Sequence, residues 1–175
     1  MDAAAPHDDL LRDADTSTLP AVPAAVVQRS LDVDARPAEL WRMIADPAEL
    51  ATWFATDVEL VVAPGGRGRL IDDDGAVRHA VVDGLEPERR LVLRWWRDDD
   101  GPETASVVTM AVSPWGDGAR LVVTEHLLGR PSSGAAAARA GLRATASTAI
   151  SAWQWRLDLL LLRVAVATEA TLARG

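Results

Sequence analysis

Charged side chains in strands that are apolar on one face are the first residues in this sequence that could do chemistry. Apolar side chains recur at every second position around Leu31 and around Leu121, which is typical of half-buried strands. Counting along these strands puts Arg29 and Glu125 on the apolar faces. A buried charge needs a partner, because burying it alone is costly. Each is therefore expected either to meet an opposite charge or to lie near a strand end and reach water.

Two histidines, His79 and His126, could transfer protons or bind zinc together with a nearby carboxylate. They lack the HxxxH or HExxH spacing of a helical zinc site. Strand parity puts His79 among valines and His126 on the face opposite Glu125. We therefore expect no metal site and no cofactor. His79 and Glu125 are candidate catalytic residues, and the alternative for each histidine is a hydrogen-bonded or exposed position.

The glycine-rich string PGGRGRL (64–70) invites comparison with a phosphate-binding loop. Such a loop needs a helix directly after it and, in a P-loop, a lysine. A strand pattern follows this string, and the chain contains no lysine. Gly65 and Gly66 are therefore expected at a hairpin turn. The chain also lacks a GxSxG nucleophile elbow.

The composition predicts a globular cytoplasmic domain. The 175 residues are 49% hydrophobic and 25% charged, and none is Cys. A net charge of −8 repels phosphate backbones, so nucleic acid is not an expected partner. The N-terminus is acidic and lacks the apolar run of a secretory signal. The most apolar stretch (157–167) contains charges and is shorter than the roughly 20 residues that span a bilayer, so no membrane span is expected.

The first elements that must position these residues are predicted from composition and periodicity. Residues 1–23, rich in Asp, Ala and Pro, are expected to form a flexible acidic tail. A strand is expected at 24–33, followed by two short helices within DARPAELWRMIADPAELATWF (34–54). The expected caps and first-turn prolines of these helices are Asp34, Asp46, Pro37 and Pro47.

The rest of the chain predicts strands and then a helix. From Thr56 to Leu128, short apolar runs alternate with turn residues, which indicates an antiparallel meander of about six strands. GRPSSG (129–134) ends the meander. The Ala- and Leu-rich remainder predicts one long helix, whose first turns Gly141 could separate. The expected class is α+β: a curved antiparallel sheet of about seven strands around a long C-terminal helix, with the domain at 24–168 and a C-terminal tail at 169–175.

Five stretches, taken in order, resemble a known family. They are DARPAELWRMIADPAELATWF; PGGRGRL with DDDG; GLEPERRLVLRWW; the strand pair SVVTMAVSP and GARLVVTEH; and AWQWRLDLLLL. Over roughly residues 25–165 the chain resembles the START/SRPBCC superfamily, in the bacterial branch named for its likeness to the C-terminal domain of the activator of the heat-shock-protein-90 ATPase. The resemblance implies a helix-grip fold without a shared catalytic set. Related branches include lipid and hormone carriers, polyketide aromatase/cyclases and co-chaperones.

The resemblance also implies an interior cavity. In the helix-grip fold the first and last strands are neighbours, so Arg29 and Glu125 are expected to meet at the polar end of this cavity, and Trp53 and Phe54 to close the other end. The expected lining is Trp53, Phe54, Leu93, Trp95, Met110, Val123, Glu125, Arg29 and Trp153. For the tryptophans, the alternative is that they fill the space between sheet and helix.

The preferred function is non-catalytic binding of a hydrophobic or amphipathic small molecule in this cavity. The first alternative is a polyketide aromatase/cyclase-like enzyme that moves protons through His79 or Glu125. The second alternative is a co-chaperone-type protein-interaction module that acts through its outer surface.

The long helix carries two apolar stripes. The first, expected to face the sheet, comprises Ile150, Trp153, Leu157, Leu160, Leu161 and Val164. The second lies about 200° around the helix and comprises Trp155, Leu159, Leu162 and Val166. A helix that is apolar on both sides is normally covered on both sides. We expect a homodimer partner to cover the second stripe or, failing that, the N-terminal tail through Leu10, Leu11 and Leu19. The alternative is one broad interface wrapped by the sheet.

Overall fold

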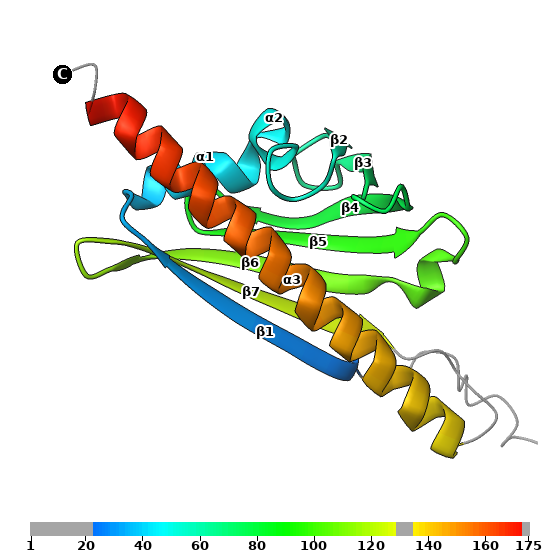
Figure 1. Cartoon of the computed structure of the whole chain (residues 1–175). Helices are drawn as coiled ribbons and strands as arrows, with labels where there is room; N and C mark the ends of the chain where they lie inside the picture. Colours follow the sequence, from blue (N-terminus) through cyan, green and yellow to red (C-terminus); the bar gives the residue numbers. More distant parts are fainter. Residues whose placement is uncertain (1–22, 129–134, 173–175) are drawn as a thin grey trace, which may run out of the picture.

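The structure is a computed structural model that describes residues 23–128 and 135–172 (Figure 1). The predicted N-terminal tail up to residue 22 and the string GRPSSG lie outside the described residues. The elements in chain order are β1 (Pro23–Val33), α1 (Pro37–Ala45), α2 (Pro47–Leu50), β2 (Asp57–Leu60), β3 (Arg67–Ile71), β4 (Val77–Glu86), β5 (Arg90–Arg97), the 3-10 helix η1 (Pro102–Thr104), β6 (Ser106–Trp115), β7 (Gly118–Leu128) and α3 (Ala135–Leu172).

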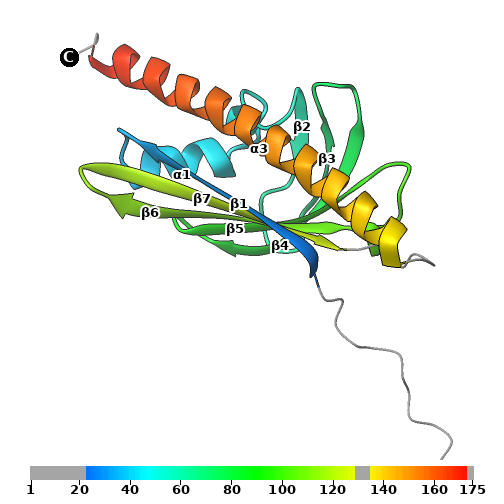
Figure 2. The same ribbon diagram turned by 60° about the horizontal axis from the view of Figure 1, so that its bottom comes forward.

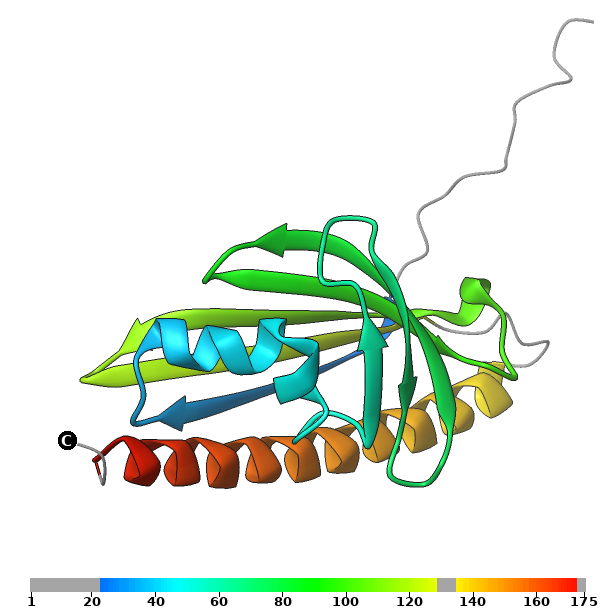
Figure 3. The same ribbon diagram turned by 90° about the horizontal axis from the view of Figure 1, so that it is seen from above.

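Seven strands form one antiparallel sheet in the order β1-β7-β6-β5-β4-β3-β2. The chain runs as a meander from β2 to β7, and β1 completes the sheet beside β7. α3 lies across one face of this sheet and close to β1 (Figures 1 and 2). Seen from above, the β2–β4 end of the sheet curls toward the middle of α3 (Figure 3). This architecture confirms the predicted α+β helix-grip class.

The two short helices begin where their prolines predict. Pro37 and Pro47 each occupy the first turn, where a missing N–H costs no hydrogen bond. The side chain of Asp46 caps α2 by accepting from the Ala48 N–H at 2.9 Å. The expected cap Asp34 is not used. Arg36 stands at the N-cap of α1, and its backbone N–H donates to the Glu39 carboxylate at 3.0 Å.

α3 packs one face on the sheet along much of its length. The buried side chains of that face include Trp153, Leu157, Leu160 and Val164. Ile150 and Leu161, which were expected to join them, are exposed, because the buried face is narrower than the predicted stripe. Gly141 does not interrupt the helix, and α3 continues to Leu172, past the predicted domain boundary. No helix within the described ranges is long and apolar enough to cross a membrane.

Two glycines differ in how much space surrounds them, and substituting each by alanine tests the packing at these positions. A Cβ at Gly66 would lie 1.9 Å from the Val61 carbonyl oxygen, whereas a Cβ at Gly141 in α3 meets no atom within 4 Å. We expect Gly66→Ala to lower the free energy of unfolding by about 1–3 kcal/mol, because backbone must move. Gly141→Ala should raise it by roughly 0.5–1 kcal/mol, because alanine is the better helix former. Urea unfolding of both variants measures these two changes in the free energy of unfolding, which should have opposite signs. A stabilising Gly66→Ala would contradict the close approach of Gly66 to the Val61 carbonyl.

Candidate functional site

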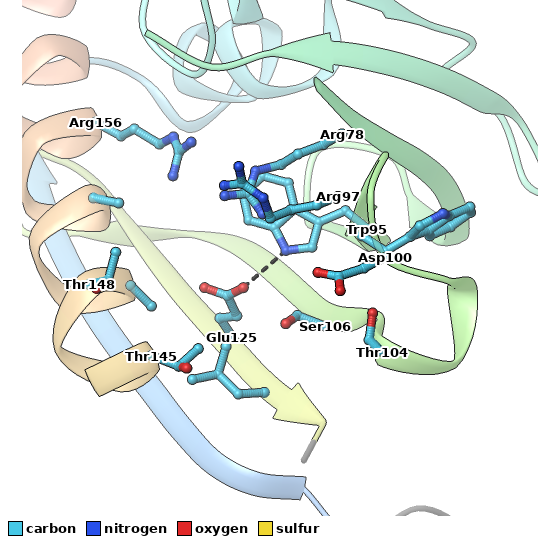
Figure 4. Close-up of a pocket in the computed structure, with 14 residues that line it drawn as sticks. Arg78, Trp95, Arg97, Asp100, Thr104, Ser106, Glu125, Thr145, Thr148 and Arg156 are labelled. Carbon is cyan, nitrogen blue, oxygen red and sulfur yellow. Dashed lines mark hydrogen bonds between the residues drawn. The ribbon is translucent and has the colours of Figure 1, made fainter. Parts of the chain in front are cut away.

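A cavity of about 390 Å³ lies between the first half of α3 and the strands β4–β7 (Figure 4). α3 contributes Thr145, Thr148, Ala149, Ala152 and Arg156. The sheet contributes Arg78, Trp95, Trp96, Arg97, Ser106, Glu125 and Leu127, and the β5–β6 connection contributes Asp100 and Thr104. Thr145 and Thr148 are themselves exposed, so the cavity is open to solvent at this end. Its volume falls within the roughly 300–1,000 Å³ of small-molecule pockets.

The cavity exists because the side chains that α3 presents to the sheet change in size. From Trp153 onward the helix buries large side chains, which fill the concave face of the sheet. Before Trp153 it presents Ala149 and Ala152, and then threonines. The sheet continues opposite these small residues, where β6 begins with Ser106 and not with an apolar side chain. Small and polar residues on both layers therefore leave a space that the core does not fill.

Glu125 is the central polar group of this site. It faces inward from β7 and is only 4% exposed. Its two carboxylate oxygens accept one indole N–H each, Oε1 from Trp95 at 2.9 Å and Oε2 from Trp153 at 2.8 Å. Trp95 comes from β5 and Trp153 from α3, so this carboxylate joins sheet and helix at the boundary between core and cavity. Each oxygen retains a further lone pair with which it could accept a hydrogen bond from a ligand.

A second buried carboxylate, Asp72, holds two arginines at the cavity wall. It follows β3 in the DDDG turn, whose Gly75 has φ of 79°. Its Oδ2 accepts from Arg78 Nε at 2.6 Å, and its Oδ1 accepts from an Arg156 terminal nitrogen at 2.8 Å. Arg156 also donates Nε–H to the Phe54 carbonyl at 2.7 Å. Two arginines from β4 and α3 are thus fixed by one acid.

Arg156 is the most strongly desolvated cation of the site and is 8% exposed. Burial is the largest influence on it and lowers the pKa of its guanidinium. The negative charge of Asp72 opposes that shift, Arg78 adds to it, and Glu125 opposes it again. The guanidinium also lies over the Trp95 and Phe54 rings, at 5.3 Å from each centroid. Carboxylates and aromatic faces together therefore compensate for its burial.

The residues expected to line the cavity divide into two groups. Trp95 and Glu125 do line it. The others expected from the interior, Trp53, Phe54, Leu93, Met110, Val123 and Trp153, are almost completely buried in the hydrophobic core. Phe54 packs against Trp53, Trp95 and Trp153 with centroid separations of 5.4, 5.5 and 5.7 Å. The end of the interior roofed by α2 is therefore filled with aromatic rings, and the space lies at the other end.

The expected pair of Arg29 and Glu125 does not form. Both residues lie on the inward face, since Arg29 is opposite Val123 and Val27 is opposite Glu125. Arg29, however, donates to the Gln28 carbonyl at 2.9 Å, while the Glu125 carboxylate is occupied by the two indoles. Arg29 is only partly buried, so it reaches water and needs no buried acid.

The histidines lie outside the cavity. His79 is opposite Trp96 on the outer face of the sheet, and its Nε2 is 2.6 Å from Asp98 Oδ1. His126 is opposite Val26 and Val107, on the same outer face. Within the described residues, no three His, Asp or Glu side chains gather in a metal-binding arrangement. His79 and Glu125, the candidate catalytic residues, therefore face opposite sides of the sheet.

The second stripe of α3 is largely open. Trp155 is 56% and Leu162 64% exposed, and Val166 is exposed as well. Leu159 is partly buried and packs against the core. The Trp155 indole N–H donates to Asp73 Oδ2 at 2.9 Å, which fixes this ring on the turn between β3 and β4.

Arg78, Arg97 and Arg156 are site residues that the sequence analysis did not identify. Arg78 could have been found by extending the inward parity of Ala80 and Val82 by one step. Arg156 follows Trp153 by three positions and so lies near the buried face of the helix. Arg97 could have been found in the same way, by extending the inward parity of Leu93 and Trp95 by one step. The small residues before Trp153 were the sequence sign of a space beside the helix.

The fold and the cavity define a helix-grip domain with a polar chamber beside its long helix. The family model described as Activator of Hsp90 ATPase homolog 1-like protein matches residues 34–153. The match covers more than half of the 175 residues, and the chain belongs to this family. No sequence among the curated proteins matches it.

Solved structures share the fold at low sequence identity. MLL2253 from Mesorhizobium loti is 23% identical with a TM-score of 0.68, and the alignment covers 82% of this chain and 98% of that chain. CalU16 from Micromonospora echinospora is 21% identical with a TM-score of 0.63, covering 86% and 84%. DynU16, described as a protein in the dynemicin biosynthetic locus, is 22% identical with a TM-score of 0.67. That alignment covers 81% of this chain but 48% of DynU16, so this chain spans about half of its length. At these identities the likeness shows the fold alone.

The Asp72 network gives a direct stability prediction. We expect Asp72→Asn to lower the free energy of unfolding by roughly 3 kcal/mol, because it leaves buried Arg156 without its compensating charge. This is the low end of the range for buried pairs, since Arg78 is partly exposed and can rehydrate. Asp57→Asn makes the same chemical change at an exposed site and should stay within about 0.5 kcal/mol of the parent. Equal midpoints for the two variants in urea unfolding would show that Asp72 does not hold the arginines.

Proposed function

We propose that the chain binds an amphipathic small molecule in the cavity beside α3, without reacting with it. The observation that carries this proposal is the cavity of about 390 Å³, lined by both apolar and charged groups, at the end of an otherwise filled core. A pocket with a few oriented polar groups on an apolar wall is the usual form of a small-molecule site.

The apolar and the polar residues of the lining would have different roles in binding. Leu127, Ala149 and Ala152 supply apolar area that a ligand body would remove from water. Glu125 would accept a hydrogen bond from the ligand, and Arg97 would donate one. The hydrogen bonds of Glu125 to Trp95 and Trp153 fix its carboxylate before a ligand arrives, which lowers the ordering cost of binding.

Binding without chemistry is preferred because of the position of the ionisable groups. The aromatase/cyclase alternative needs an acid–base pair facing the bound molecule. His79 lies on the outer face with Asp98, whereas Glu125 faces inward with two indoles, so they do not act on one molecule. The co-chaperone-type alternative makes a different demand, since it needs only the outer surface and would not respond to changes in the cavity.

Filling the cavity tests the proposal. We expect Ala152→Trp to weaken binding of the fluorescent probe 1-anilinonaphthalene-8-sulfonate at least tenfold, because the new ring occupies the ligand space. Ala165→Trp adds the same ring at an exposed position of α3 and should bind the probe like the parent. Native mass spectrometry of protein purified from its own host should detect a retained small molecule in the parent and in Ala165→Trp. Equal probe affinity and equal retention in Ala152→Trp would contradict the proposal.

We also propose that the second stripe of α3 mediates self-association. The second stripe extends from Trp155 to Val166 over roughly 17 Å of helix, and it includes an indole already fixed by Asp73. Apolar area of this kind on a helix is typical of an interface.

Leu162→Glu places a charge at the most exposed leucine of this stripe and should shift the protein toward monomer in analytical ultracentrifugation. Ser147→Glu introduces the same charge on α3 away from the stripe and should leave the distribution unchanged. A parent protein that is monomeric at high concentration, with residues 1–22 removed, would contradict self-association.

A further inference from the structure

We propose that the ligand of this cavity carries a single carboxylate, which Arg97 binds. This inference rests on the proposed binding function and specifies the ligand class. Among the described residues, three arginines line the cavity, namely Arg78, Arg97 and Arg156. Glu125 and Asp100 also line it, and Asp72 pairs with Arg78 and Arg156 at its wall. These acids equal the arginines in number, so the surroundings of each arginine, and not a net charge, decide which one can bind a ligand.

The arginines differ in how far the protein already satisfies them. Arg78 and Arg156 share Asp72 through hydrogen bonds of 2.6 and 2.8 Å, which are lengths typical of strong charge-assisted pairs. Arg97 has a weaker partner, since its Nε is 3.4 Å from Asp99, and the Asp99 side chain is 79% exposed. That contact uses only one of the five N–H groups of Arg97. Arg97 therefore retains donors that a ligand can occupy.

The donors of Arg97 point into the cavity. Figure 4 shows the Arg97 side chain extending inward next to Arg78, with Arg156 reaching toward the same region from α3. Asp72 already pairs with the other two guanidinium groups. An anion placed beside Arg97 would gain charge-assisted hydrogen bonds from it.

The arrangement of the charges favours a carboxylate over a phosphate. Arg97 is the lining arginine held only by a long contact to an exposed acid, and one negative charge matches it. A phosphate carries close to two negative charges at neutral pH and would place the excess near Glu125. The guanidinium fork also matches the two oxygens of a carboxylate. The body of the ligand would then lie along Leu127, Ala149 and Ala152, which are the apolar part of the lining.

Three probes with one chain length and different head groups test this assignment: decanoate, decanol and decylamine, titrated calorimetrically into the full chain. We expect decanoate to bind at least about tenfold more tightly than decanol, as for hydrogen bonds to a charged group. Arg97→Gln should remove this preference, so that decanoate and decanol bind this variant with similar affinity. Arg94→Gln is the control, because Arg94 stands on the outer face of the same strand, paired with Asp83.

The outcomes separate the two proposals. Equal affinity for decanoate and decanol, tighter binding of decylamine, or a preference for decanoate that persists in Arg97→Gln would overturn the carboxylate assignment and leave the binding function standing. Failure of all three probes to bind would count against the binding function itself, and the carboxylate assignment would fall with it.

Discussion

The arrangement of this domain depends on a buried carboxylate, Glu125, that accepts indole N–H groups from Trp95 and Trp153. One indole belongs to the sheet and the other to α3, so the hydrogen bonds fix how the helix lies on the strands. On one side of this point the interior is filled by the rings of Trp53 and Phe54 and by leucines. On the other side the helix presents Ala149 and Ala152, and the cavity begins. Glu125 therefore lies at the boundary between the filled hydrophobic core and the cavity.

Asp72 and Arg156 make a second polar attachment of α3 to the sheet. Buried ion pairs contribute little net stability, since apolar side chains of similar volume often pack as well. Their presence here has another consequence, which is orientation. Asp72 holds Arg78 and Arg156 in fixed positions beside the cavity, and Trp95 supplies an aromatic face for both. Polar groups that are costly in a core are retained here beside a cavity, where they hold side chains from β4 and α3 in place.

The fold was predictable from the sequence because its signals are local. Prolines mark the starts of α1 and α2, and alternating apolar side chains mark the strands. A long stretch rich in Ala and Leu marks α3. The position of the cavity was not predictable from parity alone. Parity places Met110 and Val123 inside, but it does not say which interior positions are filled. That depends on how side chains from separate elements meet, as when Arg156 reaches Asp72 across 84 positions of sequence. Arg29 shows the same limit, because it shares the face of Glu125 but bonds to its own neighbour.

In the proposed binding, the overall acidic charge and the arginines of the cavity would act on different quantities. The overall charge would affect the association rate, and the cavity side chains would affect the affinity. At physiological salt, charges farther apart than about 8 Å are largely screened, so the net charge of −8 has little effect on a ligand already inside the cavity. Within that range the nearest groups decide, and these are Arg97, Arg78 and Glu125. The overall field slows the approach of an anion only modestly at this ionic strength. Under the proposed function, selectivity for a ligand head group would therefore depend on a few fixed side chains and not on the net charge of the chain.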